Sequence, residues 1–258
     1  MREADMLTVN AYGPTVTEPL VLLHGFPFDS RMWADVLAAM PRVGVLTMDA
    51  PGFGRSAPID GGLEDYADAV AETLTARGVQ RAVVAGLSMG GYVALALAER
   101  HPDRLAGIGL LDTKAQADPE PARQNRLRVA DAALGPEGAA AVAPMIDVLT
   151  APGAPAQVRA TVTRWLEEAP PSGIAWGQRA MAARPDRLNV LDGLDIPGLV
   201  LRGSDDATAS VADHEAMSRA LGTDVVQVAG AGHMSAVEAP GAVAEALSDL
   251  VARVRHTG

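Results

Sequence analysis

A serine between two glycines is the side chain in this sequence whose setting most favours nucleophilic chemistry. Ser88 is the centre of a Gly-x-Ser-x-Gly pattern with Gly86 and Gly90. Residues 82–86 before it predict a buried strand, and residues 91–100 predict a helix. A serine on such a turn projects its hydroxyl clear of the backbone, and side chains at the two glycines would collide. Because the pattern also occurs by chance in glycine-rich turns, the flanking strand and helix are what make it specific.

A histidine and two aspartates late in the chain have the types that a nucleophilic serine needs. His233 lies in a glycine-rich loop, and Asp205 and Asp206 directly follow a predicted strand. In serine-based catalysis a histidine takes the hydroxyl proton and a carboxylate orients the imidazole. The order serine, acid, histidine is the one expected for a serine on a strand-to-helix turn. A lone histidine in such a loop is more often a surface residue, so the upstream Ser88 is what favours a catalytic His233.

Short apolar stretches alternate with helical patterns along much of the chain. The predicted strands are 6–12, 19–23, 43–48, 82–86, 105–111, 198–202 and 224–228. The predicted helices are 31–40, with Ser30 as its cap, 63–77, 91–100, 211–221 and 242–254. This alternation predicts an α/β fold, a mostly parallel sheet with helices on both faces.

The alternation stops near residue 113. Alanine, proline, charge and helical periodicity dominate the stretch that follows, and no strand is predicted there. Several prolines divide this stretch into short helices. We therefore expect an α/β core made of residues 1–113 and 188–258, with an inserted helical cap over residues 114–187.

Composition limits the remaining possibilities. The 258 residues carry a formal net charge of −11, which argues against nucleic acid or an anionic membrane as a partner. Cysteine is absent, which excludes disulfides and thiolate catalysis, and the five histidines show no metal-ligand spacing. The first ten residues have no signal-peptide pattern, and no apolar run reaches the length of about 18 residues that would span a membrane. These observations predict a cytoplasmic protein without a metal.

Five motifs, in order along nearly the whole chain, resemble those of the α/β-hydrolase family. They are His24-Gly25-Phe26-Pro27, Asp49-x-Pro51-Gly52-x-Gly54-x-Ser56, the turn at Ser88, Gly203-x-x-Asp206 and Gly232-His233. The proline that usually continues the acid segment is absent, and Ala207-Thr208-Ala209-Ser210 stands there instead. The choice between Asp205 and Asp206 therefore stays open, although the spacing from Gly203 favours Asp206.

The resemblance implies an α/β-hydrolase fold and a triad of Ser88, Asp206 and His233. It further implies an oxyanion hole made by the backbone N–H groups of Phe26 and Met89. Met89 opens a predicted helix and Phe26 follows a predicted strand, so both N–H groups can face a developing oxyanion.

Other polar residues near these motifs have structural interpretations. We expect His24 and Asp49 to brace the loops in which they lie, and Glu238 to cap or brace the final helix. Asp112, at the end of a predicted strand, is a weaker candidate for the acid. Arg31 is expected on an exposed helix surface rather than as a carboxylate anchor.

The pocket is expected between the cap and the motif loops. Its candidate wall residues are Trp165, Trp176, Met145 and Leu149. Each of these side chains, taken alone, is better explained as packing the cap against the core.

The segments HGFPFDSRMW and GLSMGGYVALALAERHP resemble those of small esterases, of 3-oxoadipate enol-lactonase-like hydrolases and of cofactor-free perhydrolases. We therefore expect a hydrolase that cleaves a small carboxylic ester or lactone through an acyl-enzyme and without a cofactor. A non-hydrolytic catalyst with the same triad, such as a lyase or a perhydrolase, is the alternative, because a fold does not determine a reaction. A third hypothesis is a ligand-binding protein on a retired scaffold, which the complete set of three groups disfavours. Serine at position 88 argues against haloalkane dehalogenases and epoxide hydrolases, and no oligomeric state is predicted.

Overall fold

Strands from both halves of the chain meet in one sheet. The computed structural model describes residues 7–257, and over this range it has a seven-stranded sheet in the order β1-β3-β2-β4-β5-β6-β7. The strands are β1 (Val9–Tyr12), β2 (Leu20–Leu23), β3 (Val45–Met48), β4 (Ala82–Leu87), β5 (Leu105–Leu111), β6 (Gly198–Gly203) and β7 (Val225–Val228). β1 pairs antiparallel with β3, and the other neighbouring strands pair in parallel. The predicted α/β class is confirmed, and residue 6 of the first predicted strand lies outside the described residues.

The strands between β1 and β7 are buried along their whole length. They consist almost entirely of apolar residues, as is typical of a parallel sheet that is covered on both faces. The carboxyl ends of β4, β5 and β6 lie side by side in this sheet. Because parallel strands end at the same edge, the residues that follow these three strands are brought together there.

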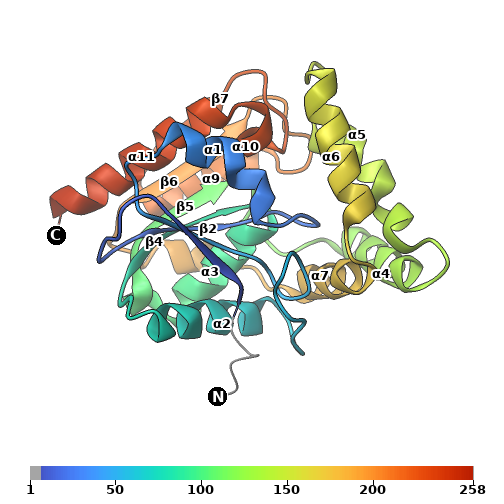
Figure 1. Ribbon diagram of the computed structural model, residues 1–258, viewed down its shortest axis with the longest axis horizontal. Helices are drawn as coiled ribbons and strands as arrows, with labels where there is room; N and C mark the ends of the chain where they lie inside the picture. Colours follow the sequence, from blue (N-terminus) through green and yellow to red (C-terminus); the bar gives the residue numbers. More distant parts are fainter. Residues whose placement is uncertain (1–6, 258) are drawn as a thin grey trace.

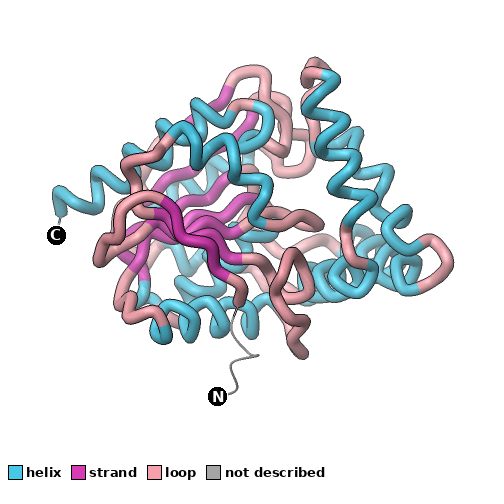
Figure 2. Tube along the Cα trace, viewed as in Figure 1, coloured by secondary structure: helices cyan, strands magenta, loops and turns pink. Residues whose placement is uncertain are grey.

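Helices cover both faces of the sheet (Figures 1 and 2). The flanking helices are α1 (Ala34–Ala39), α2 (Leu63–Ala76), α3 (Met89–Arg100), α8 (Leu188–Leu191), α9 (Val211–Leu221), α10 (Ser235–Glu238) and α11 (Pro240–Thr257), with the 3₁₀ turns η2 (Ser30–Trp33) and η3 (Pro102–Arg104). On one face α1 packs against α11, and on the other α2 packs against α3. No helix in the described part of the chain is long and apolar enough to cross a membrane.

The helix predicted at 31–40 begins differently from the prediction. Residues 30–33 form the 3₁₀ turn η2, and the side chain of Asp29, rather than that of Ser30, caps it by accepting a hydrogen bond from the N–H of Arg31 at 2.9 Å. The prediction for Ser30 is wrong because its hydroxyl accepts a hydrogen bond from the side chain of Asn10 instead.

A run of helices separates β5 from β6 in the sequence. They are α4 (Glu120–Leu134), the 3₁₀ segment η4 (Gly138–Met145), α5 (Ile146–Leu149), α6 (Ala156–Glu168) and α7 (Pro171–Ala183). This stretch, all of which is described, contains no strand, and Figure 2 shows it as helices and loops beside the sheet. We call α4 to α7 the inserted helices. Among them α4 packs along α7, and α5 packs against α6 (Figure 1).

Candidate active site

The backbone at Ser88 has a conformation that is rare outside glycine. Ser88 lies between β4 and α3 with φ 53° and ψ −112°. Such strain costs about 1–3 kcal/mol and persists where the surroundings enforce it. A Cβ atom at Gly86 would lie 2.1 Å from the carbonyl oxygen of Gly90, and one at Gly90 would lie 2.2 Å from that of Leu23. The two glycines therefore permit the close contact between strand and helix that holds Ser88 in this turn.

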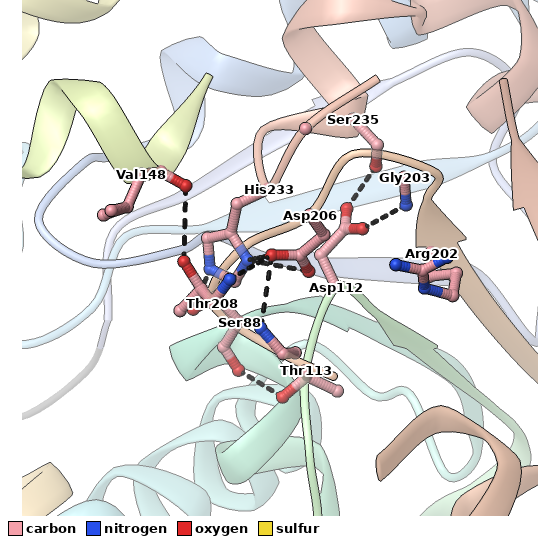
Figure 3. Close-up of polar contacts among 12 residues, drawn as sticks. Ser88, Asp112, Thr113, Val148, Arg202, Gly203, Asp206, Thr208, His233 and Ser235 are labelled. Carbon is pink, nitrogen blue, oxygen red and sulfur yellow. Dashed lines mark hydrogen bonds and ion pairs between the residues drawn. The ribbon is translucent and has the colours of Figure 1, made fainter. Parts of the chain in front are cut away.

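His233 reaches Ser88 from the loop between β7 and α10 (Figure 3). Its Nε2 atom lies 2.8 Å from Ser88 Oγ, and its Nδ1 atom lies 3.0 Å from each carboxylate oxygen of Asp206. The backbone N–H groups of Thr208 and Ala209 donate to Asp206 at 2.7 and 3.2 Å. The result is a continuous chain of hydrogen bonds from carboxylate to imidazole to hydroxyl, a geometry suited to moving the serine proton.

The two neighbouring aspartates have different surroundings. Asp206 is buried, whereas Asp205 is exposed and its carboxylate accepts a hydrogen bond from Ser204 Oγ at 3.1 Å. The N–H of Asp205 donates to the carbonyl oxygen of Ala231 at 2.9 Å, which holds the two loops together. The structure thus brings Asp206 to His233, and Asp205 does not contact this histidine.

The interaction between Asp206 and His233 shifts the pKa of both side chains. Burial alone would lower the pKa of His233, but the charge and hydrogen bond of Asp206 outweigh it and raise this pKa above its ordinary value. Burial likewise opposes ionisation of Asp206, yet His233 and the N–H groups at residues 208 and 209 lower the pKa of this carboxyl. Asp206 is therefore ionised at neutral pH and favours the Nδ1–H tautomer, which leaves Nε2 free to accept the Ser88 proton.

Phe26 and Met89 lie beside Ser88 and close to each other. Met89 is the first residue of α3, so its N–H lies outside the hydrogen-bond ladder of the helix. A Cβ atom at Gly177 of α7 would lie 2.8 Å from Cδ2 of Phe26 and 3.7 Å from Sδ of Met89. One at Gly25 would lie 3.6 Å from Cβ of Ser88. Both backbone segments that the resemblance assigns to an oxyanion hole therefore border the serine.

His24 and Asp49 hold the loops around Phe26, as expected. The buried His24 accepts a hydrogen bond from the N–H of Ala50 at Nε2, 2.8 Å away, while its Nδ1 lies 3.0 Å from the carbonyl oxygen of Gly25. Asp49 accepts from the N–H groups of residues 30 and 55 at 2.9 and 3.2 Å. Neither side chain is hydrogen-bonded to Ser88 or His233. Both therefore stabilise the loops in which they lie rather than take part in the contacts of Ser88.

Glu238 braces a different segment from the predicted one. Its carboxylate accepts from the N–H of Gly232 at 3.0 Å and from the N–H of Ala151 at 2.9 Å. The expectation that it caps or braces the final helix is wrong, because α11 begins at Pro240 and Glu238 faces the residues before His233. Glu238 therefore joins the histidine loop to the chain that follows α5.

The two candidate pocket tryptophans lie on the inserted helices and contact the core. Trp165 of α6 packs edge-to-face on Phe28, with ring centroids 6.0 Å apart, and it borders a small cavity together with Pro27 and Phe53. Trp176 of α7 donates from Nε1 to the carbonyl oxygen of Gly61 at 3.1 Å. Trp165 therefore lies next to the Phe26 segment, whereas the hydrogen bond of Trp176 reaches a loop before α2.

The other two candidate pocket residues differ in exposure. Met145 is half-buried, whereas Leu149 is only 1% exposed. The carbonyl oxygen of Leu149 accepts a hydrogen bond from the N–H of Met234 at 3.0 Å, directly after His233. The end of α5 is thus attached to the histidine loop. Arg31 is exposed, as predicted, and its guanidinium binds Asp29 and Glu168.

Thr113 and Ser235 lie near Ser88 and His233 but did not emerge from the sequence as parts of the site, whereas Asp112 was expected there as a weaker candidate for the acid; the carboxylate bonded to His233 is that of Asp206. Thr113 Oγ1 donates to the carbonyl oxygen of Ser88 at 2.8 Å, and Asp112 binds Ser235 and the N–H of Gly203 (Figure 3). The available signal for Thr113 was its position, since it follows β5, which adjoins β4. Ser235 had no local signal.

One group of buried side chains has the types that bind metal ions. One ligand atom each of Asp112, Asp206 and His214 lie within 4.8 Å of one another. The carboxylates of Asp112 and Asp206 already accept hydrogen bonds from the loops around them. We therefore assign these carboxylates to the loops and to His233, rather than to a metal.

This fold and this site define the class of the protein. The sequence matches the Alpha/beta hydrolase family over residues 20–246, and the chain belongs to this family. The resemblance seen in the five motifs is thereby confirmed.

Known esterases and an enol-lactonase are similar to this chain. 3-Oxoadipate enol-lactonase 1 of Acinetobacter baylyi is 25% identical over 98% of this chain and 96% of that protein. The structure of a thermophilic esterase from Thermogutta terrifontis, with malate bound, is 35% identical, has a TM-score of 0.91 and covers 96% of this chain and 93% of that one. A pimeloyl acyl-carrier protein methyl ester esterase of Shewanella woodyi is 37% identical over 91 residues, and this match spans only 34% of its length.

Proposed function

We propose that this protein is a serine hydrolase that cleaves a small carboxylic ester or lactone through an acyl-enzyme. The observation that carries the proposal is the chain of contacts from Asp206 to His233 at 3.0 Å and from His233 to Ser88 at 2.8 Å. The near full-length similarity to an esterase and to an enol-lactonase supports this substrate class. Both kinds of substrate offer an acyl carbon that a serine hydroxyl attacks.

Acylation begins when His233 Nε2 takes the Ser88 proton as Oγ bonds to the acyl carbon. The carbonyl oxygen gains negative charge, and the backbone N–H groups of Phe26 and Met89 stabilise it. As the tetrahedral intermediate collapses, the bond to the alkoxy oxygen breaks and His233 returns the proton to that oxygen. An ester releases an alcohol, whereas an opened lactone keeps its hydroxyl on the acyl chain.

Deacylation uses the same groups with water as the nucleophile. His233 takes a proton from the water, whose oxygen attacks the acyl carbon of the acyl-enzyme. Collapse of the second intermediate breaks the bond to Ser88 Oγ, which recovers its proton from His233 and releases the carboxylic acid. Asp206 stabilises the imidazolium in both steps. Protein groups supply every part of this reaction, so it requires neither a metal nor a cofactor.

The substrate pocket belongs, in this proposal, between a core of residues 1–113 and 188–258 and a helical cap of residues 114–187. Its walls include Trp165, Trp176, Met145 and Leu149. The apolar surface of these side chains suits an uncharged acyl or alcohol group. The position of Trp165 beside Phe28 supports this placement, because it brings α6 next to the segment that carries Phe26.

Turnover of p-nitrophenyl esters of increasing acyl length, and of lactones of increasing ring size, tests the proposal. We expect a burst of p-nitrophenol from the wild type, labelling of Ser88 by a fluorophosphonate, and no turnover by a folded Ser88→Ala variant. Undiminished turnover by that variant contradicts the proposed nucleophile. Labelling of Ser88 without turnover of any ester or lactone indicates a lyase or perhydrolase instead, and absence of labelling indicates a binding protein.

A further inference from the structure

Asp112 is a buried carboxylate that the proposed reaction does not use. It directly follows β5 and is 0% exposed. Its backbone φ of 45° lies in the left-handed region, which residues other than glycine seldom adopt. The backbone N–H of Asp112 donates to the carbonyl oxygen of Leu201 at 2.9 Å. The sheet and this unusual backbone conformation therefore hold the carboxylate in a defined place beside β6.

The two oxygens of this carboxylate bind two different loops (Figure 3). Oδ1 accepts a hydrogen bond from the N–H of Gly203 at 2.7 Å, and Oδ2 accepts one from Ser235 Oγ. Gly203 precedes Asp206 by three residues, and Ser235 follows His233 by two. A single side chain thus connects the loop that carries the proposed acid to the loop that carries the proposed base.

These loops are in direct contact beside Asp112. A Cβ atom at Gly203 would lie 2.2 Å from the carbonyl oxygen of Gly232 and 2.4 Å from that of Ala231. Only glycine fits such an approach of one backbone to another. Movement of either loop at this point would change the distance between Asp206 and His233, and Asp112 is bonded to both loops.

Several charged or titratable groups surround Asp112. Asp206 lies on the acid loop, His233 on the histidine loop, Arg202 at the end of β6, and His214 on α9. His214 donates from Nδ1 to the carbonyl oxygen of residue 210, and its buried Nε2 has no hydrogen-bond partner among the described residues. The negative charge of Glu238, on α10, also favours a higher pKa of His233.

The charge of Asp112 acts on His233. Burial lowers the pKa of His233, but the charge and hydrogen bond of Asp206, and to a smaller extent the charge of Asp112, outweigh burial and raise this pKa. Burial, together with the like charge of Asp206, raises the pKa of Asp112 itself to about 7, although His233 opposes this rise.

We infer that Asp112 is a positioning residue of the active site: its carboxyl group, bonded to Gly203 and Ser235, holds Asp206 and His233 at the distance at which the imidazole meets Ser88. This inference rests on the proposed function. The carboxyl group of Asp112 is bonded to the two loops rather than to Ser88, so in this proposal it acts through those loops and through its charge. A protonated carboxyl still accepts from the N–H of Gly203 and can donate its own O–H to Ser235 Oγ, so protonation of Asp112 removes its charge but keeps the connection between the loops.

Two variants separate the hydrogen bond from the charge. Ser235→Ala keeps the charge of Asp112 and removes its bond to the histidine loop, so kcat should fall about 10- to 100-fold with KM unchanged. Asp112→Asn keeps the shape and removes the charge. Its amide still bonds both partners, because Ser235 Oγ can accept as well as donate. We expect the acid limb of the kcat profile to shift to lower pH in Asp112→Asn and to become less steep.

An NMR titration of the His233 imidazole gives a readout that does not depend on turnover. Asp112→Asn should lower the pKa of His233, whereas Asp224→Asn, which removes the same charge from an exposed position before β7, should leave it unchanged. Circular dichroism checks the fold of each variant. If Asp112→Asn fails to fold, the kcat of Ser235→Ala decides the inference.

The outcomes separate this inference from the proposed function. Wild-type kcat in Ser235→Ala, or an unchanged pKa of His233 in folded Asp112→Asn, overturns the positioning role while the proposed hydrolase activity stands. If the wild type cleaves no ester or lactone, the proposed function fails. The titration of His233 then still reports whether Asp112 sets the charge of this histidine.

Discussion

Asp118 and Arg184 form a buried ion pair, with 2.7 Å between Oδ1 and Nη2. Asp118 lies just before α4, and Arg184 directly follows α7, so the pair joins the two ends of the inserted helices. The guanidinium of Arg184 also lies 4.1 Å from the ring centroid of Tyr92 on α3. Since α3 begins next to Ser88, this junction fixes the inserted helices to the element that carries the proposed nucleophile.

Replacement of Asp118 by alanine should destabilise the protein strongly. The side chains of Asp118 and Arg184 are 1% and 2% exposed, and Lys114 and Arg126 bind the same carboxylate. Loss of one partner leaves buried positive charge without compensation, which costs about 3–5 kcal/mol. Urea unfolding measures this change. The matched control is Asp147→Ala, whose 77% exposed carboxylate pairs with Arg159 and should contribute less than about 1 kcal/mol. Equal losses in the two variants would argue against a special role for the buried pair.

Asp206→Asn should reduce kcat by about 10³- to 10⁴-fold with little change in KM, because the imidazole loses the partner that sets its tautomer. Asp205→Asn is the control, since it makes the same change one residue earlier on an exposed side chain that contacts Ser204. Steady-state kinetics on a p-nitrophenyl ester compare the two variants. A larger loss in Asp205→Asn than in Asp206→Asn would reverse the assignment of the acid.

The pH dependence of kcat/KM should follow His233. Only the neutral imidazole accepts the Ser88 proton, and Asp206 raises the pKa of His233 above its ordinary value of 6.5. Activity should therefore be complete above this raised pKa and fall as the pH drops through it. In Asp206→Asn the effect of burial dominates, so the residual activity should persist to lower pH. An acid limb at the same pH in both proteins would show that another group controls it.

Gly90→Ala should damage both the fold and the activity. The new Cβ atom would lie 2.2 Å from the carbonyl oxygen of Leu23, and its three nearest atoms all belong to the backbone of residues 23 and 24, so no flexible side chain can give way. We expect a loss of about 1–3 kcal/mol in unfolding free energy, together with a fall in kcat as the turn at Ser88 shifts. Gly241→Ala serves as the control and should keep the activity. Gly241 lies in α11, and an added Cβ atom there would meet nothing within 4 Å beyond its own helix backbone. Normal kcat in Gly90→Ala would contradict the requirement for glycine there.

Local patterns were sufficient to predict the sheet, its strands and the turn at Ser88. The two glycines around Ser88 indicate the turn, and the apolar runs indicate buried strands. Both signals depend only on residues close together in the sequence. The order of the five motifs then placed a serine, an acid and a histidine after parallel strands, whose carboxyl ends meet at one edge. For this reason the family and the approximate site could be predicted without coordinates.

The sequence by itself therefore determined the α/β class, the motif order and the residue types at the site. Only the tertiary structure decided that Asp206 rather than Asp205 contacts His233, that Glu238 braces the histidine loop, and that Asp112 joins two loops. Asp112 is 91 residues from Gly203 and 123 residues from Ser235 along the chain. Contacts over such separations depend on how the loops pack and on the direction of each side chain, and neither leaves a periodic pattern in the sequence.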